Sequence, residues 1–186
     1  MRTAIFDLET FSLSADTGIL LCAAIREYRS KQPPTVIRAD SYPEWKSDRT
    51  NVKPMVLAVV DALKEYDIFV AHNGQYFDKP MLISWCVKFH CSTKLRFAKF
   101  IDPVLLARRH MKLTRNSLSA LLAFLDIPEK KTSIEWKHWM QAAFNGDRKS
   151  MDYIVEHCVV DVNLLEKAYE RTKKLVNNID NRGSSF

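Results

Sequence analysis

The chain has 186 residues, and its 28 Lys and Arg residues against 22 Asp and Glu residues give a net charge of +6. This length predicts one domain rather than two, and a hydrophobic content of 47% excludes a disordered chain. The four cysteines form no CxxC pair, which excludes a zinc ribbon and a thioredoxin-type site. The sequence has no run of 18 apolar residues and no apolar N-terminal segment of signal-peptide length, so we expect a soluble, cytoplasmic protein without a membrane partner.

The first third of the chain predicts three strands and a helix. Apolar runs at residues 3–8, 18–25 and 35–38 have strand length, and their short connections predict antiparallel pairing. The segment that begins with Pro43-Glu44-Trp45 is expected to form a turn and loop. Apolar residues at three- and four-residue steps then predict an amphipathic helix over 52–65.

Strands alternate with helices in the rest of the chain. We expect strands over 67–71 and 97–101, and helices over 78–90, 103–111, 118–125, 135–144 and 149–176. Trp136 and Trp139 are expected to be core residues of the helix over 135–144. This order predicts an α/β domain with a mixed sheet over residues 1–176, followed by a frayed tail over 177–186.

Two acidic residues lie at the end of the first predicted strand. Asp7 and Glu9 are two residues apart, so the alternation of a strand puts both carboxylates on the same face. Two like charges at a sheet centre repel each other, and a divalent cation would compensate for them, because Mg²⁺ and Mn²⁺ prefer carboxylate oxygens. The alternative is that the pair ends the strand in solvent.

Two further segments carry acidic residues with a defined spacing. Asp78 follows the turn that starts at His72 and begins a predicted helix, where an ordinary N-cap is the alternative interpretation. His157 and Asp161 are four residues apart, hence on one face of the last helix, and a surface His–Asp pair is the alternative there.

Together these segments resemble the three exonuclease motifs of the DEDD superfamily, the DnaQ-like, ribonuclease H-like 3′–5′ exonucleases. Phe6-Asp7-Leu8-Glu9-Thr10 is similar to the first motif and the segment from His72 to Asp78 to the second. The resemblance spans roughly residues 2–172, and the region from Phe100 to Trp136 is closest to the polymerase B-like branch. The resemblance implies a ribonuclease H-like mixed sheet with three antiparallel strands and then parallel strands.

The third motif departs from both branches of that family. The Tyr branch has Tyr-x3-Asp and the His branch has His-x4-Asp, whereas this chain has His157-x3-Asp161. We interpret His157 as a substitution within the frame of the Tyr branch.

The resemblance also implies a mechanism with two divalent cations, Mg²⁺ or Mn²⁺, at a phosphodiester bond. Asp7 would bridge both ions, Glu9 and Asp161 would complete one site, and Asp78 would hold the second ion. His157 would accept the proton of the attacking water. Four further residues are expected at the substrate: Thr10, Phe11, Asn73 and Phe77. Backbone amides near Thr10 would hold the 3′ end, and Phe11 or Leu13 would insert between the terminal bases.

We therefore expect a 3′–5′ exonuclease that binds single-stranded 3′ ends of DNA or RNA, with a polymerase or a replication or repair protein as a separate partner. A catalytically inactive binding module and an endonuclease of the same fold are the competing hypotheses. Some basic residues would either follow the phosphate backbone or form a solvated surface: Arg108, Arg109, Lys112, Arg115, Lys130, Lys131 and Lys137.

Overall fold

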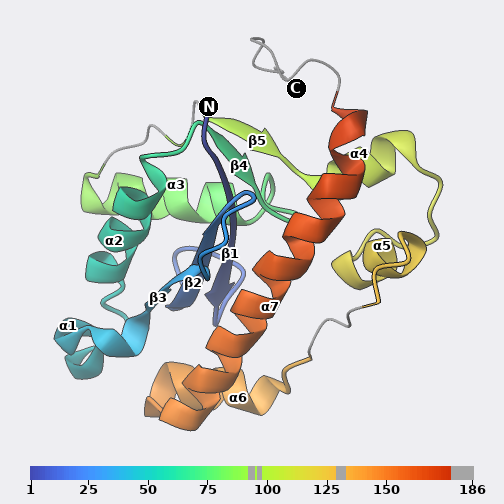
Figure 1. Cartoon of the computed structure of the whole chain (residues 1–186). Helices are drawn as coiled ribbons and strands as arrows, with labels where there is room; N and C mark the ends of the chain where they lie inside the picture. The colour runs from blue at the N-terminus through green and yellow to red at the C-terminus, as the bar shows by residue number, and fades with distance from the viewer. Residues whose placement is uncertain (92–94, 96–97, 129–132, 177–186) are drawn as a thin grey trace.

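A computed structural model describes residues 1–91, 95, 98–128 and 133–176, so Lys130, Lys131 and the predicted tail lie outside the described residues. Its centre is a five-stranded sheet with the order β3-β2-β1-β4-β5 (Figure 1). The strands are β1 (Thr3–Thr10), β2 (Leu20–Glu27), β3 (Thr35–Arg38), β4 (Ile68–Val70) and β5 (Lys99–Ile101).

The sheet is mixed, as the sequence predicts. β1 pairs antiparallel with β2 and β2 antiparallel with β3, because the connections between them are too short for a crossover. β4 is parallel to both β1 and β5. β1 is therefore the central strand, with hydrogen-bonded neighbours on both sides.

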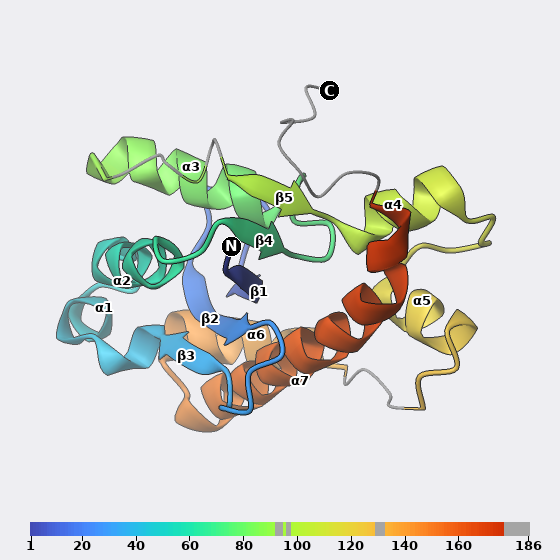
Figure 2. The same cartoon turned by 45° about the horizontal axis from the view of Figure 1, so that its top comes forward.

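Helices cover both faces of the sheet. The long helix α7 packs on β1 and β2, and α2 packs on β2 and β3 (Figures 1 and 2). Figure 2 shows α2 and α3 on one side of the sheet and α7, with α4 and α5 beside it, on the other. The principal helices are α2 (Lys53–Leu63), α3 (Asp78–Phe89), α4 (Pro103–His110), α5 (Leu118–Phe124), α6 (Trp136–Met140) and α7 (Arg148–Thr172). Among the described residues, no helix combines the length and apolarity needed to cross a bilayer.

The alternation along β1 separates a core face from a face that carries acids. Phe6 is fully buried, and its ring lies 5.9 Å from that of Phe69 on β4 and 6.0 Å from that of Phe100 on β5. We call these three residues the core aromatic cluster. Asp7 and Glu9 point to the opposite face of β1, toward α7.

Two predictions about local structure are wrong. Pro43–Ser47 forms a short helix, α1, rather than a loop, because Pro43 occupies its first turn and Trp45 is buried with 1% of its surface exposed. The helix expected over 135–144 is present, as α6 followed directly by a π-helical turn, Gln141–Asn145. Trp136 is not a core residue, since 61% of its surface is exposed, whereas Trp139 packs against the core as expected.

Candidate active site

The first two acidic residues lie where the regular part of β1 ends. Asp7 is opposite Ala24 of β2 and Glu9 is opposite Cys22, and the register then shifts between Glu9 and Thr10. Such an irregularity bends the strand and redirects the side chains that follow it. The bulge therefore ends the regular ladder directly after the acidic pair.

Asp78 is held beneath β1 by a backbone hydrogen bond. The backbone N–H of Leu8 donates to its Oδ1 over 3.1 Å, and only 1% of its surface is exposed. Burial, and then the neighbouring Asp7 carboxylate, raise the pKa of Asp78 well above its ordinary value. Phe77 rather than Asp78 is the N-cap residue of α3, so the N-cap interpretation of Asp78 is wrong.

The turn before Asp78 depends on a residue to which the sequence assigns no catalytic role. Asp102 is buried with 4% of its surface exposed, and its carboxylate accepts hydrogen bonds from the backbone N–H groups of Asn73 (3.0 Å) and Gln75 (3.3 Å). Asn73 has a positive φ of 62°, and a Cβ at Gly74 would lie 2.3 Å from the Cβ of Ala71. Asp102 thus fixes the turn that leads into Asp78.

Helix α7 brings the third motif to the same place. His157 and Asp161 are buried, with 8% and 6% of their surfaces exposed. The Nε2 atom of His157 lies 3.8 Å from Oε1 of Glu9 and 3.7 Å from Oδ2 of Asp161. The imidazole therefore lies between two carboxylates from different elements, which excludes the surface-pair interpretation.

These side chains line one polar cavity of about 480 Å³. It includes all five residues predicted to be catalytic, and Asn73 and Phe77 among those predicted to contact substrate. Thr10 and Phe11 follow Glu9 directly but do not line it. The complete lining is Asp7, Leu8, Glu9, Leu13, His72, Asn73, Tyr76, Phe77, Asp78, His157 and Asp161.

Sequence reasoning missed three polar residues of this site. His72 and Tyr76 line the cavity and were given no role, and Asp102 supports it from below. His72 and Tyr76 belong to the same turn as Asn73 and Phe77, and membership of this turn is the sequence feature that indicates a position at the cavity. Asp102 precedes a proline at a predicted helix start, which is typical of an N-cap, and its Oδ1 does accept the Val104 N–H over 2.9 Å.

The donor set of the cavity fits a hard divalent cation. Ligand atoms of Asp7, Glu9 and Cys158 lie within 4.8 Å of one another. Burial, and then the neighbouring Cys22 thiol, raise the pKa of Cys158 well above its ordinary value, and its S–H donates to the backbone oxygen of Asp7 over 3.5 Å. Cys158 is therefore a protonated thiol that packs beneath the acids, and the available ligands are carboxylate oxygens, as Mg²⁺ and Mn²⁺ prefer.

A second, larger cavity has a different character. It measures about 610 Å³ and lies between α2 and β4, with mostly apolar lining residues that include Leu57, Val60 and Phe69. Its carboxylate, Asp61, pairs with Lys64 at the surface. Size alone does not identify the site, since only the smaller cavity gathers convergent acids.

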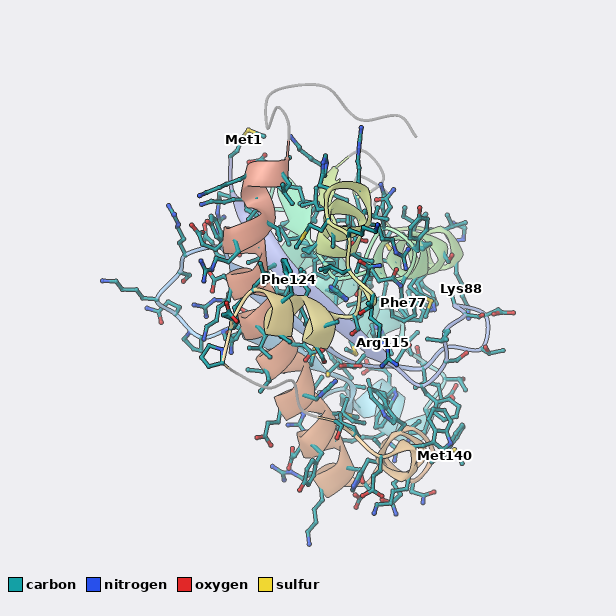
Figure 3. All side chains as sticks on the ribbon, turned by 90° about the vertical axis from the view of Figure 1, so that its right-hand side faces the viewer. Met1, Phe77, Lys88, Arg115, Phe124 and Met140 are labelled. Carbon is teal, nitrogen blue, oxygen red and sulfur yellow. The ribbon has the colours of Figure 1, made fainter. Side chains whose placement is uncertain are left out.

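The predicted basic residues that the structure describes are on the surface. Arg108, Arg109, Lys112 and Arg115 are exposed at the end of α4 and in the segment that follows it. Lys137 is exposed and pairs with Glu135 over 2.8 Å. Figure 3 shows Arg115 on the same side of the molecule as Phe77 of the cavity.

Comparison with known proteins gives the family. A family model described as RNase_H superfamily matches residues 4–173. The chain belongs to the RNase H superfamily. Its RNase H-like fold is also similar to that of the family B DNA polymerase from the hyperthermophilic archaeon Pyrobaculum calidifontis, with a TM-score of 0.65 and 14% identity over 92% of this chain. This member of the superfamily spans only 24% of that polymerase chain, and at this identity the likeness shows the fold alone. No curated protein matches the sequence.

Proposed function

We propose that this RNase H-like protein is a metal-dependent 3′–5′ exonuclease of the DEDD type, which hydrolyses phosphodiester bonds at the 3′ end of DNA or RNA. One observation carries the proposal: Asp7, Glu9, Asp78 and Asp161, from three elements, line one cavity together with His157. Asp78 and Asp161 are buried and Asp7 and Glu9 are half-buried, and carboxylates gathered in one such cavity repel each other and lose hydration. A fold that retains four of them without a ligand would be destabilised.

Two divalent cations would be held by these four residues. Asp7 would contribute to holding both ions, Glu9 and Asp161 would hold one of them with it, and Asp78 would hold the other. When bound, such ions lower the pKa of water, orient the phosphate and neutralise the charge that develops at phosphorus. The hydrogen bond from the Leu8 N–H to Oδ1 of Asp78 holds this carboxylate at the cavity.

His157 would accept the proton of the attacking water. An imidazole, with a reference pKa of about 6.5, exchanges protons near neutral pH, whereas a tyrosine hydroxyl, near 10, mainly orients water. The position of His157 between Glu9 and Asp161 suits this role, because both carboxylates stabilise the imidazolium that results.

The remaining cavity residues would position the strand end. Asn73 and Phe77 line the cavity, and Thr10 and Phe11 follow the bulge beside it. We propose that these four residues contact a single-stranded 3′ end. A separate polymerase or repair protein would then be a partner rather than a requirement for hydrolysis.

A 5′-labelled oligonucleotide, as DNA and as RNA, tests the activity with Mg²⁺ or Mn²⁺. A 3′–5′ exonuclease gives a descending ladder, an endonuclease gives discrete internal products, and a binding module leaves the label intact. Glu9→Gln should abolish the ladder, and Glu156→Gln is the matched control, since Glu156 is exposed on α7. Intact substrate under all metal conditions would reject the proposal.

The role of His157 is tested separately. His157→Ala should lose most of the hydrolysis rate between pH 6 and 9, and His157→Tyr should restore part of that rate with a different pH profile. If His157→Ala keeps the wild-type rate and profile, another group activates the water.

A further inference from the structure

Four large apolar side chains lie exposed or half-buried beside the acidic cavity. We call them the aromatic strip: Phe11, Trp136, Met140 and Phe144. Trp136 is 61% exposed, Met140 42% and Phe144 51%. Exposed apolar surface in one patch, rather than scattered singly, marks an interaction site.

The local structure explains why three of these side chains share a face. Trp136, Met140 and Phe144 recur at steps of four residues, and each such step turns a regular α-helix by about 40° beyond one full turn. The π-helical turn Gln141–Asn145 takes up one more residue per turn, which keeps Phe144 on the side of Met140. The opposite face carries Ala142 and Ala143, both fully buried.

Phe11 connects the strip to the cavity. Its ring lies 5.1 Å from that of Trp136 and 4.6 Å from that of Phe144, and it follows Glu9 by two residues, just after the bulge. Leu13, 83% exposed, lines the cavity and is two residues further along. A chain whose end lies among the acids can therefore extend along the rings.

We propose that the aromatic strip binds the bases of single-stranded nucleic acid upstream of the strand end in the cavity, with Trp136 as its main stacking surface. The inference rests on the proposed function, which supplies the polymer that leaves the cavity. Aromatic faces stack on any base, so this contact requires unpaired bases and no particular sequence. The strip thus selects single-stranded tails that reach several nucleotides beyond the terminal one.

The charges around the strip fit a polyanion better than a basic partner. Glu135, its nearest carboxylate in sequence, is neutralised by Lys137, and Arg148 and Lys149 are exposed just after the π-helical turn. A strand stacked on the rings would have these cations within reach of its phosphates.

Tryptophan fluorescence provides a direct test. Trp45 and Trp85 are each 1% exposed and Trp139 is half-buried, so Trp136 is the exposed indole. In a hydrolysis-deficient Asp7→Asn protein with Mg²⁺, a dT decamer should quench the fluorescence, whereas a decamer of tetrahydrofuran abasic residues should not. Trp136→Phe should remove the quenching while the decamer still binds.

Affinity gives a second measurement on the same protein. Trp136→Ala should weaken binding of the dT decamer by about tenfold, as expected for one lost stacking contact, and should leave the abasic decamer unaffected. Phe124→Ala is the matched control, because Phe124 is 59% exposed on α5. In the hydrolysing protein, Trp136→Ala should raise KM for a ten-nucleotide tail and leave kcat unchanged.

The outcomes separate this inference from the proposed function. Quenching by the dT decamer without any hydrolysis by the wild-type protein would retain the strip and reject the exonuclease. Hydrolysis with equal affinity for base-containing and abasic strands, or unchanged affinity in Trp136→Ala, would reject the strip as a base-binding surface and favour a protein partner there.

Discussion

Two groups of aromatic side chains flank the acidic pair of β1, and they differ in burial rather than in ring contact. In the core aromatic cluster the rings of Phe69 and Phe100 lie 5.4 Å apart, and in the aromatic strip those of Phe11 and Phe144 lie 4.6 Å apart. Phe69 is 1% exposed, whereas Phe144 is 51% exposed.

This difference shows how one strand serves both the fold and the site. Phe6 points to the side of α2 and α3 and is sealed by β4 and β5, so its contacts contribute to stability. Phe11 follows the bulge at Glu9 and Thr10, beyond the regular ladder, and joins a surface that a ligand can reach. Asp7 and Glu9 lie in sequence between Phe6 of the buried core aromatic cluster and Phe11 of the exposed aromatic strip.

The largest effect should come from the core aromatic cluster. Phe69→Ala should lower the free energy of unfolding by about 3–5 kcal/mol, because it removes a buried ring and leaves a cavity. Phe144→Ala should cost no more than about 1 kcal/mol, since half of that ring is already in water. Urea unfolding of both variants measures the contrast, and equal losses would contradict it.

A smaller loss of stability is expected when Asp102, which holds the turn before Asp78, is replaced. Asp102→Ala leaves the backbone N–H groups of Asn73, Gln75 and Val104 without their acceptor, which should cost about 1–3 kcal/mol of stability. Asp16→Ala, at an exposed position, is the control. Metal titration followed by Tm should also show a smaller gain in the Asp102 variant, because the turn no longer positions Asp78. A variant that keeps both the stability and the full gain would show that the turn is fixed by other contacts.

In the absence of metal, Asp78→Asn should raise the stability, whereas Asp102→Ala should lower it. Because the folded state raises the pKa of Asp78, it binds this proton more tightly than the unfolded chain does. The stability gained from this tighter proton binding is fully present below the unfolded pKa of about 3.9. It is lost as the pH rises through the raised pKa of the folded state. The metal-free variant should therefore be more stable than wild type at pH 7, and lose the Tm gain with Mn²⁺. Parallel Tm curves for the two proteins between pH 4 and 8 would exclude this explanation.

The smallest effect concerns the exposed cations after α4. If Arg115 contacts a phosphate, Arg115→Ala should reduce the slope of log affinity against log salt by about 0.7, the value for one single-strand contact. Lys88→Ala, an exposed cation at the end of α3, is the control. An unchanged slope would favour a solvated surface.

Local patterns predicted most of the elements and half of the site. Alternation along β1 put Asp7 and Glu9 on one face, and helical spacing put His157 next to Asp161, because both periods are properties of the backbone. Their convergence with Asp78 depends on the order of strands in the sheet, which no local pattern contains. The resemblance to a known family supplied that information.

The failures have a common physical cause. Trp45 and Trp136 both occupy short helices, and the first is buried while the second is exposed. Periodicity shows that a helix has an apolar face, but what covers that face is decided by distant segments. The support from Asp102 was missed for the same reason, since its partners Asn73 and Gln75 are 29 and 27 residues away.

The central position of β1 has a consequence for local opening. The strand pairs with β2 from Ala4 to Thr10 and with β4 from Thr3 to Ile5, and α7 covers its acidic face. Exchange of its paired amides with deuterated solvent requires opening of the whole sheet, so they should be among the slowest in the protein. The short helix α6 has no such restraint and should exchange much faster. The acids on β1 and the aromatic strip would then differ in how well they tolerate substitution. Sequence variation at the strip would leave the acids in place.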